Sequence, residues 1–78
     1  MKPQLRMVTG AKSLLVWYDL TGESMCYALG VGDLLVATGE SSEWEFASSE
    51  GPAVRVITPD KGSGWVPLYD LSEVTVEL

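Results

Sequence analysis

The apolar residues of this chain come in short runs that glycine, proline or polar residues close, and this pattern limits the fold more than any other feature. Runs of four to seven residues rich in β-branched and aromatic side chains are typical of strands, whereas helices need a periodic pattern over ten residues or more. The expected strands cover residues 13–19, 25–29, 34–38, 53–58, 64–67 and 74–78. Residues 68–73 are expected to form a single 3₁₀ turn. The sequence therefore predicts a small all-β protein of five to six strands that close into a barrel or sandwich to hide their edges.

The segments between these runs have the composition of turns. Residues 21–24, 30–33 and 59–62 combine glycine with Asp, Ser, Thr or Pro, which are the residues that turns prefer. The glycines of 62–64 are interpreted as turn glycines too, since no helix follows them to build a phosphate site. Residues 40–52 hold two aromatic residues among four acids and are expected to form an irregular loop.

The length of 78 residues excludes a second domain. We expect residues 1–12 to be an N-terminal leader, which either adds a strand or hangs free, and residues 13–78 to be the barrel. Cys26 is the only cysteine, so an internal disulfide is excluded and a reducing, cytoplasmic location is expected. The sequence has no apolar segment near the ~20 residues of a membrane span, so no membrane partner is expected.

The charge is strongly acidic and uneven. The chain carries −6, but three of its five basic residues lie in residues 1–12, which leaves two basic against eleven acidic residues and a charge of −9 for residues 13–78. Such a surface repels phosphate backbones, so nucleic acid is not an expected ligand. Solubility, a basic partner and mimicry of nucleic-acid charge all remain open as reasons for this charge.

The side chains do not combine into a catalytic site. The chain has no histidine, and Cys26 therefore has no histidine partner to activate it. The acidic residues of 40–50 lack the alternating ligands and central glycine of a calcium loop. We expect a protein that is not an enzyme and that uses no metal and no cofactor.

Three motifs, in order, resemble the Src-homology-3 (SH3) barrel, with the closing half similar to its bacterial form. VWYDL at 16–20 is similar to the opening strand of that family. VGDLLV at 31–36 with ESSEW at 40–44 is similar to its strand and acidic loop, and GSGWVP at 62–67 with LSEV at 71–74 is similar to its ending. The resemblance implies an SH3-like barrel that binds other proteins.

In that family, Pro-rich peptides lie between aromatic ridges. Tyr18, Trp44 and Pro67 match ridge positions, whereas Leu20 replaces a second tyrosine, and Tyr69 lies one place before the position of the late tyrosine. An insertion over residues 45–52 follows the matching tryptophan. These departures disfavour a groove for Pro-rich peptides.

The leading hypothesis is a non-enzymatic protein-interaction module. Its expected apolar anchors are Tyr18, Trp44, Pro67 and Tyr69. The acids expected to attract a basic partner are Asp19, Glu23 and Glu43. A homodimer through the same aromatic face is compatible with this hypothesis. The alternative is a small acidic inhibitor or virion component of a bacterial virus that occupies a nucleic-acid-binding site.

Overall fold

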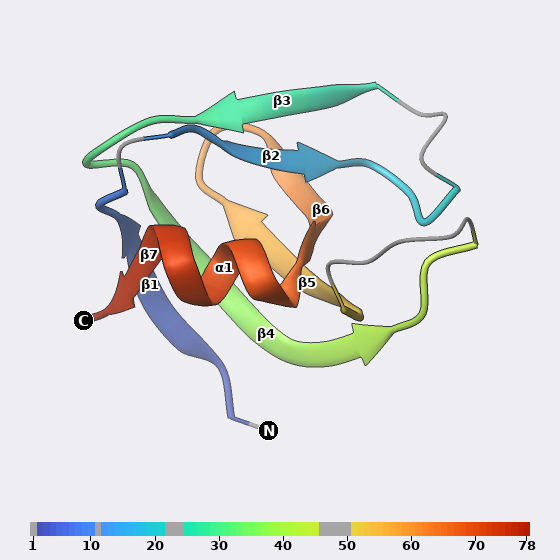
Figure 1. The fold of residues 1–78 in the computed structure, drawn as a ribbon. Coiled ribbons are helices and arrows are strands. Elements are labelled where there is room, and N and C mark those ends of the chain that lie inside the picture. Colours follow the sequence, from blue (N-terminus) through green and yellow to red (C-terminus); the bar gives the residue numbers. More distant parts are fainter. Residues whose placement is uncertain (1, 11, 22–24, 46–50) are drawn as a thin grey trace.

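The described chain forms one antiparallel sheet of seven strands and one short helix (Figure 1). The computed structural model describes residues 2–10, 12–21, 25–45 and 51–78. The strands and the helix are β1 Gln4–Val8, β2 Leu14–Trp17, β3 Cys26–Leu29, β4 Leu34–Ser42, β5 Ala53–Thr58, β6 Gly62–Pro67, α1 Leu68–Val74 and β7 Thr75–Glu77. The all-β prediction is therefore confirmed. In this part of the chain no helix has the length and apolar character needed to cross a membrane.

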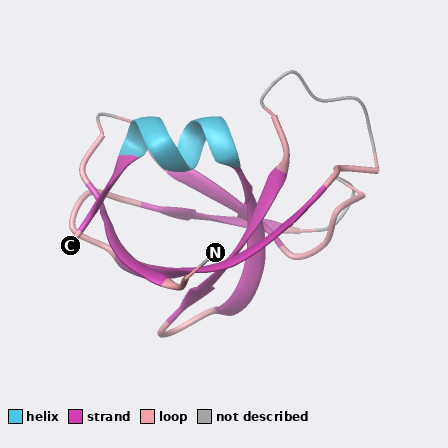
Figure 2. Cartoon of the chain, turned by 90° about the horizontal axis from the view of Figure 1, so that it is seen from below, coloured by secondary structure: helices cyan, strands magenta, loops and turns pink. Residues whose placement is uncertain are grey.

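The strand order β3-β2-β6-β5-β4-β1-β7 corrects two details of the prediction. The sheet has seven strands rather than five or six, because β1, inside the expected leader, pairs with β4 on one side and β7 on the other. The sheet is also not closed, because β3 and β7 remain its two edges. Figure 2 shows the sheet curling while α1 lies along one side of it.

The core lies inside the curl of the sheet. On β5, Val54 and Val56 point inward and are buried, while Arg55 and Ile57 point outward, as the two-residue period of a strand requires. α1 adds Leu71 and Val74, which lie three residues apart and so share one helix face. The seven residues of α1 replace the single 3₁₀ turn that was expected. Burial of each large aliphatic side chain stabilises the fold by about 1.5–3 kcal/mol.

β4 runs further than the sequence suggests. The apolar run ends at Gly39, yet the strand continues to Ser42. Gly39 has φ +92°, and the pairing with β5 shifts register between Ala37 and Ser41. The glycine therefore makes an irregularity of the β-bulge kind, which bends a strand without ending it. Residues 40–42 consequently belong to β4 and not to the expected loop.

Gly64 is a strand glycine and not a turn glycine. It is buried in β6, and a Cβ atom there would lie 2.5 Å from Val16 Cγ1 and 2.9 Å from the Trp17 carbonyl oxygen. β2 and β6 meet at the aligned pair of Trp17 and Trp65. The missing side chain of Gly64 is what lets the β2–β3 hairpin approach the rest of the sheet this closely.

Candidate functional site

Tyr18 is exposed at the end of β2 and lies against a second tyrosine. Its side chain is 46% exposed, and its ring centroid is 5.4 Å from that of Tyr27, with the planes tilted by 53°. Tyr27 is partly buried, packs on the core, and its hydroxyl lies 3.0 Å from Thr58 Oγ1. The exposed ring of Tyr18 is thus an aromatic surface that packs against Tyr27. Sequence reasoning missed Tyr27, although its position two residues before buried Leu29 indicates that it faces inward.

Asp19, an expected steering acid next to Tyr18, holds a local turn. Asp19 is exposed, and its Oδ1 accepts hydrogen bonds from the backbone N of Thr21 at 2.9 Å and from the Thr21 hydroxyl at 2.6 Å. This is the Asx-turn arrangement by which a short acidic side chain holds a turn. Glu23 lies outside the described residues.

Trp44 follows β4 and reaches the same end of the molecule as Tyr18. It is partly buried, with its indole Nε1 inside, while Glu43 beside it is exposed. The backbone N of Glu45 donates to the carbonyl of Leu20 at 2.9 Å. This bond places the segment after Tyr18 next to the segment of Trp44, so the structure brings these two predicted anchors to neighbouring segments.

Pro67 and Tyr69 lie at the junction of β6 and α1. Pro67 pairs with Ala53 in the sheet and is buried, so its ring offers no exposed surface to a partner, contrary to its expected role as an anchor. Tyr69 is in the first turn of α1 and is 62% exposed. The backbone N of Leu68 donates to the Pro52 carbonyl at 2.9 Å. The predicted anchors therefore divide between the β2 end and the start of α1.

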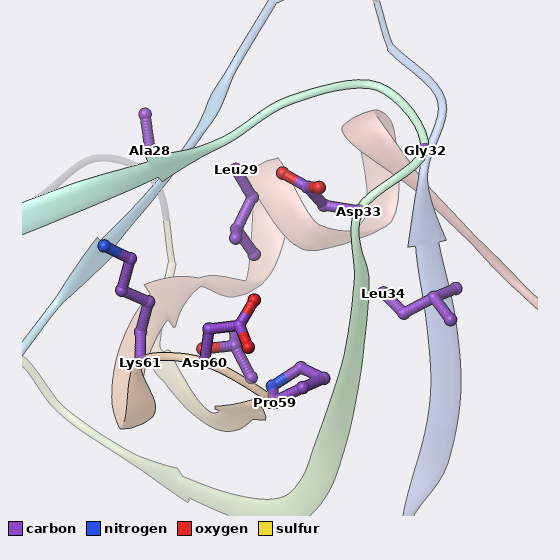
Figure 3. A pocket seen from close by; sticks show the side chains of 9 residues that line it. Ala28, Leu29, Gly32, Asp33, Leu34, Pro59, Asp60 and Lys61 are labelled. Atoms are coloured by element: carbon purple, nitrogen blue, oxygen red, sulfur yellow. The ribbon is translucent and has the colours of Figure 1, made fainter.

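A pocket of about 310 Å³ opens between the β3–β4 turn and the β5–β6 loop (Figure 3). Figure 3 shows the Leu29 side chain between the carboxylates of Asp33 and Asp60 in this view. The residues that line the pocket are Ala28, Leu29, Gly32, Asp33, Leu34, Thr58, Pro59, Asp60 and Lys61. Its volume is at the lower end of the range of about 300–1,000 Å³ for ligand pockets. Sequence reasoning missed this pocket, because its walls come from turns that are distant in the chain.

The pocket continues from the tyrosine pair. Thr58 lines the pocket and contacts the Tyr27 hydroxyl, and the Tyr27 ring packs against the Tyr18 ring. Asp33 is held in place, since its Oδ2 accepts a hydrogen bond from the backbone N of Gly30 at 2.8 Å. Asp60 is exposed in the loop before β6. A chain of side-chain contacts that passes through buried Thr58 thus links the tyrosine pair to an apolar pocket with two carboxylates in its walls.

Arg55 is a further residue that sequence reasoning missed. It is the one charged residue in the β-branched run of β5, and this position could have indicated that its side chain has a specific role. Its guanidinium lies 5.6 Å from the Trp65 ring centroid, its Nη1 is 3.7 Å from Glu40 Oε2, and its Nη2 donates to Ser63 Oγ at 3.3 Å. These contacts cover part of the outward face of Trp65 and give Arg55 a structural role.

The acidic residues of the described ranges do not gather into one cluster. In the described ranges, no three His, Cys, Asp or Glu side chains gather closely enough to hold a metal ion. Cys26 is a free, exposed thiol on edge strand β3. No family model, curated protein or solved structure matches this chain. Its function is therefore inferred from the geometry of its own residues.

Proposed function

We propose that this chain is a non-enzymatic protein-interaction module of the SH3-like kind that binds a basic segment of another protein. The observation that carries the proposal is the path from exposed Tyr18, over Tyr27 and Thr58, to a pocket with Asp33 and Asp60 in its walls. The order of the SH3-like motifs along the chain supports the same proposal.

The apolar and the acidic residues of the pocket suit the apolar stem and the charged head of a basic side chain. Lys and Arg carry an apolar stem and a charged head. The stem packs on Leu29 and Pro59, while the head meets the carboxylates of Asp33 and Asp60. A neighbouring apolar residue of the same partner packs on Tyr18, because exposed tyrosines are frequent anchors at interfaces. The net charge of −6 draws a basic partner to the molecule from a distance.

The inventory of side chains supports a binding role without catalysis. The chain contains no histidine, which is the commonest general base near neutral pH. Asp33 and Asp60 both line the pocket and are exposed. Their two carboxylates supply charge complementarity to a cation.

A second candidate function is the mimicry of nucleic-acid charge. Glu40, Glu43 and Glu45 are all exposed, and they follow one another along the end of β4 and the residues after it. A row of negative charges of this kind is what a nucleic-acid-binding surface would recognise. This candidate uses the β4 end, whereas the leading proposal uses the pocket, so the two are separable by mutation.

The test uses an array of short synthetic peptides of graded charge. We expect basic peptides to bind the wild-type protein, and binding to weaken about tenfold or more in Tyr18→Ala and in Asp60→Asn, which corresponds to the loss of about 1.4 kcal/mol. Glu73→Gln is the matched control for charge, because Glu73 is exposed on α1 and away from the pocket lining. Binding that does not depend on peptide charge, or that survives both site variants, contradicts the proposal. Loss only on neutralising the β4 glutamates would favour the second candidate.

A further inference from the structure

The outer face of the sheet carries a continuous apolar surface across four strands. In antiparallel pairs, directly opposite residues point to the same face. Leu5 is opposite Val36, which is opposite Ile57, and Met7 is opposite both Val76 and Leu34. The backbone N of Leu78 bonds to the carbonyl of Leu5 and extends the first row. We call this surface the apolar sheet face, and it consists of Leu5, Met7, Leu34, Val36, Ile57, Val76 and Leu78.

The apolar sheet face is large for a molecule of this size. Leu5, Leu34, Ile57, Val76 and Leu78 are each between 42% and 61% exposed. Large aliphatic side chains that are exposed together on one face form an apolar patch, and the largest such patch of a monomer is often functional. Figure 1 shows β7, β1 and β4 as neighbouring strands on this side of the molecule.

The apolar sheet face is uncharged in its seven side chains, although the molecule as a whole carries −6. At its β5 border, the exposed Glu40 is opposed by Arg55, with Glu40 Oε2 3.7 Å from Arg55 Nη1. Two acidic molecules therefore approach each other here with less repulsion than elsewhere, whereas a basic partner is drawn to the acidic surfaces and not to this one.

We propose that two copies of this chain associate through the apolar sheet face and form a sandwich of two sheets. A stable interface buries about 800 Å² on each partner, of which about 56–65% is apolar. The five exposed aliphatic residues of the apolar sheet face would supply the apolar centre of such an interface. A twofold axis brings the same patch of both copies together, so the fit needs no second protein, and twofold dimers are the commonest oligomers. This interface leaves Tyr18 free and shares Leu34 with the lining of the pocket, so the two proposals are tested with different variants, Ile57→Glu here and Tyr18→Ala there.

The test is the mass of the protein in solution by sedimentation, over a wide range of concentrations. We expect the wild-type mass to double at high concentration and to fall to that of one chain on dilution. Raising the salt concentration should favour the dimer, because salt screens the repulsion between two acidic chains. Ile57→Glu should remain a monomer at every concentration. Val31→Glu is the matched control, since Val31 is 73% exposed in the β3–β4 turn and outside the face, and it should dimerise as the wild type does.

Folding of each variant is checked by its far-UV circular dichroism. Leu5→Thr offers a second, uncharged change on another strand, and it should weaken dimerisation about tenfold or more while the strand is kept. A wild type that stays monomeric at all concentrations would overturn the proposal. So would a dimer that survives folded Ile57→Glu, a dimer lost only in Tyr18→Ala, or a mass that rises beyond two copies.

Discussion

Replacement of Gly64 by alanine should destabilise the fold strongly, because the added methyl group has no room. It would stand 2.5 Å from Val16 Cγ1 and 2.9 Å from the Trp17 carbonyl oxygen, and both distances are below those that real Cβ atoms adopt. Val16 is fully buried and β-branched, so its side chain has few ways to move. The oxygen belongs to the backbone, so relief requires a shift of β2 itself.

The size of the effect follows from the kind of contact. Overpacking a core costs about 1–3 kcal/mol, and the backbone contact places Gly64→Ala near the upper value. A chain of this length has a free energy of unfolding of about 4–12 kcal/mol, so the loss is a large share of it. About 3 kcal/mol corresponds to a fall in Tm of about 12–24 °C for a domain of this size.

Thermal unfolding followed by circular dichroism measures this difference. Gly30→Ala is the matched control, because a Cβ atom at Gly30 meets nothing within 4 Å and the residue has no positive φ. Its stability should change by less than about 1 kcal/mol, in the stabilising direction that a stiffer unfolded chain predicts. Equal Tm values for Gly64→Ala and Gly30→Ala would refute the packing of β2 against β6 described above.

Three further changes test other contacts. Tyr27→Phe removes the hydrogen bond to Thr58 and should lower the free energy of unfolding in urea by about 0.5–1.5 kcal/mol. Leu35→Ala removes a side chain that is 1% exposed and should cost about 2–5 kcal/mol in the same assay. Glu40→Gln breaks an exposed ion pair with Arg55, so the change in Tm should correspond to less than about 1 kcal/mol and vanish in high salt.

The local features of the fold were largely accessible from the sequence. The run of Ala53–Thr58 forms β5 over those same residues, and Pro59, Asp60 and Lys61 form the loop before β6. Gly62 ends that loop with φ +81°, as a three-residue hairpin loop closed by a left-handed glycine requires. Such turns depend on residues that are close in the chain, and composition reports them directly.

The non-local features were not accessible in the same way. Gly39 reads as the end of a strand, but pairing with β5 carries β4 past it. Gly64 begins the expected strand 64–67 and was also interpreted as a turn glycine, whereas its close contact with β2 decides its role. Both misreadings arise because a glycine has the same local preference in a turn, a bulge and a close contact between strands.

The candidate site also combines local features, which the sequence indicates, with non-local features, which it does not. Tyr18 and Tyr69 are exposed, whereas the burial of Pro67 results from its pairing in the sheet. Asp33 and Asp60 were read as ordinary turn residues. Their meeting at one pocket depends on how two distant turns pack, which no local pattern records.

The position of β1 also has a consequence for biosynthesis. Of the seven described strands β1 is made first, yet it pairs with β4 and with β7, which is made after the other six. Sheets with such distant pairings fold slowly, on a scale of about milliseconds to seconds. Until residues 75–77 have emerged from the ribosome, β1 lacks one of its two neighbours, and Leu5 and Met7 stay more exposed than in the finished sheet. Until β7 has been made, the nascent chain therefore has an unpaired strand edge at β1, which favours aggregation.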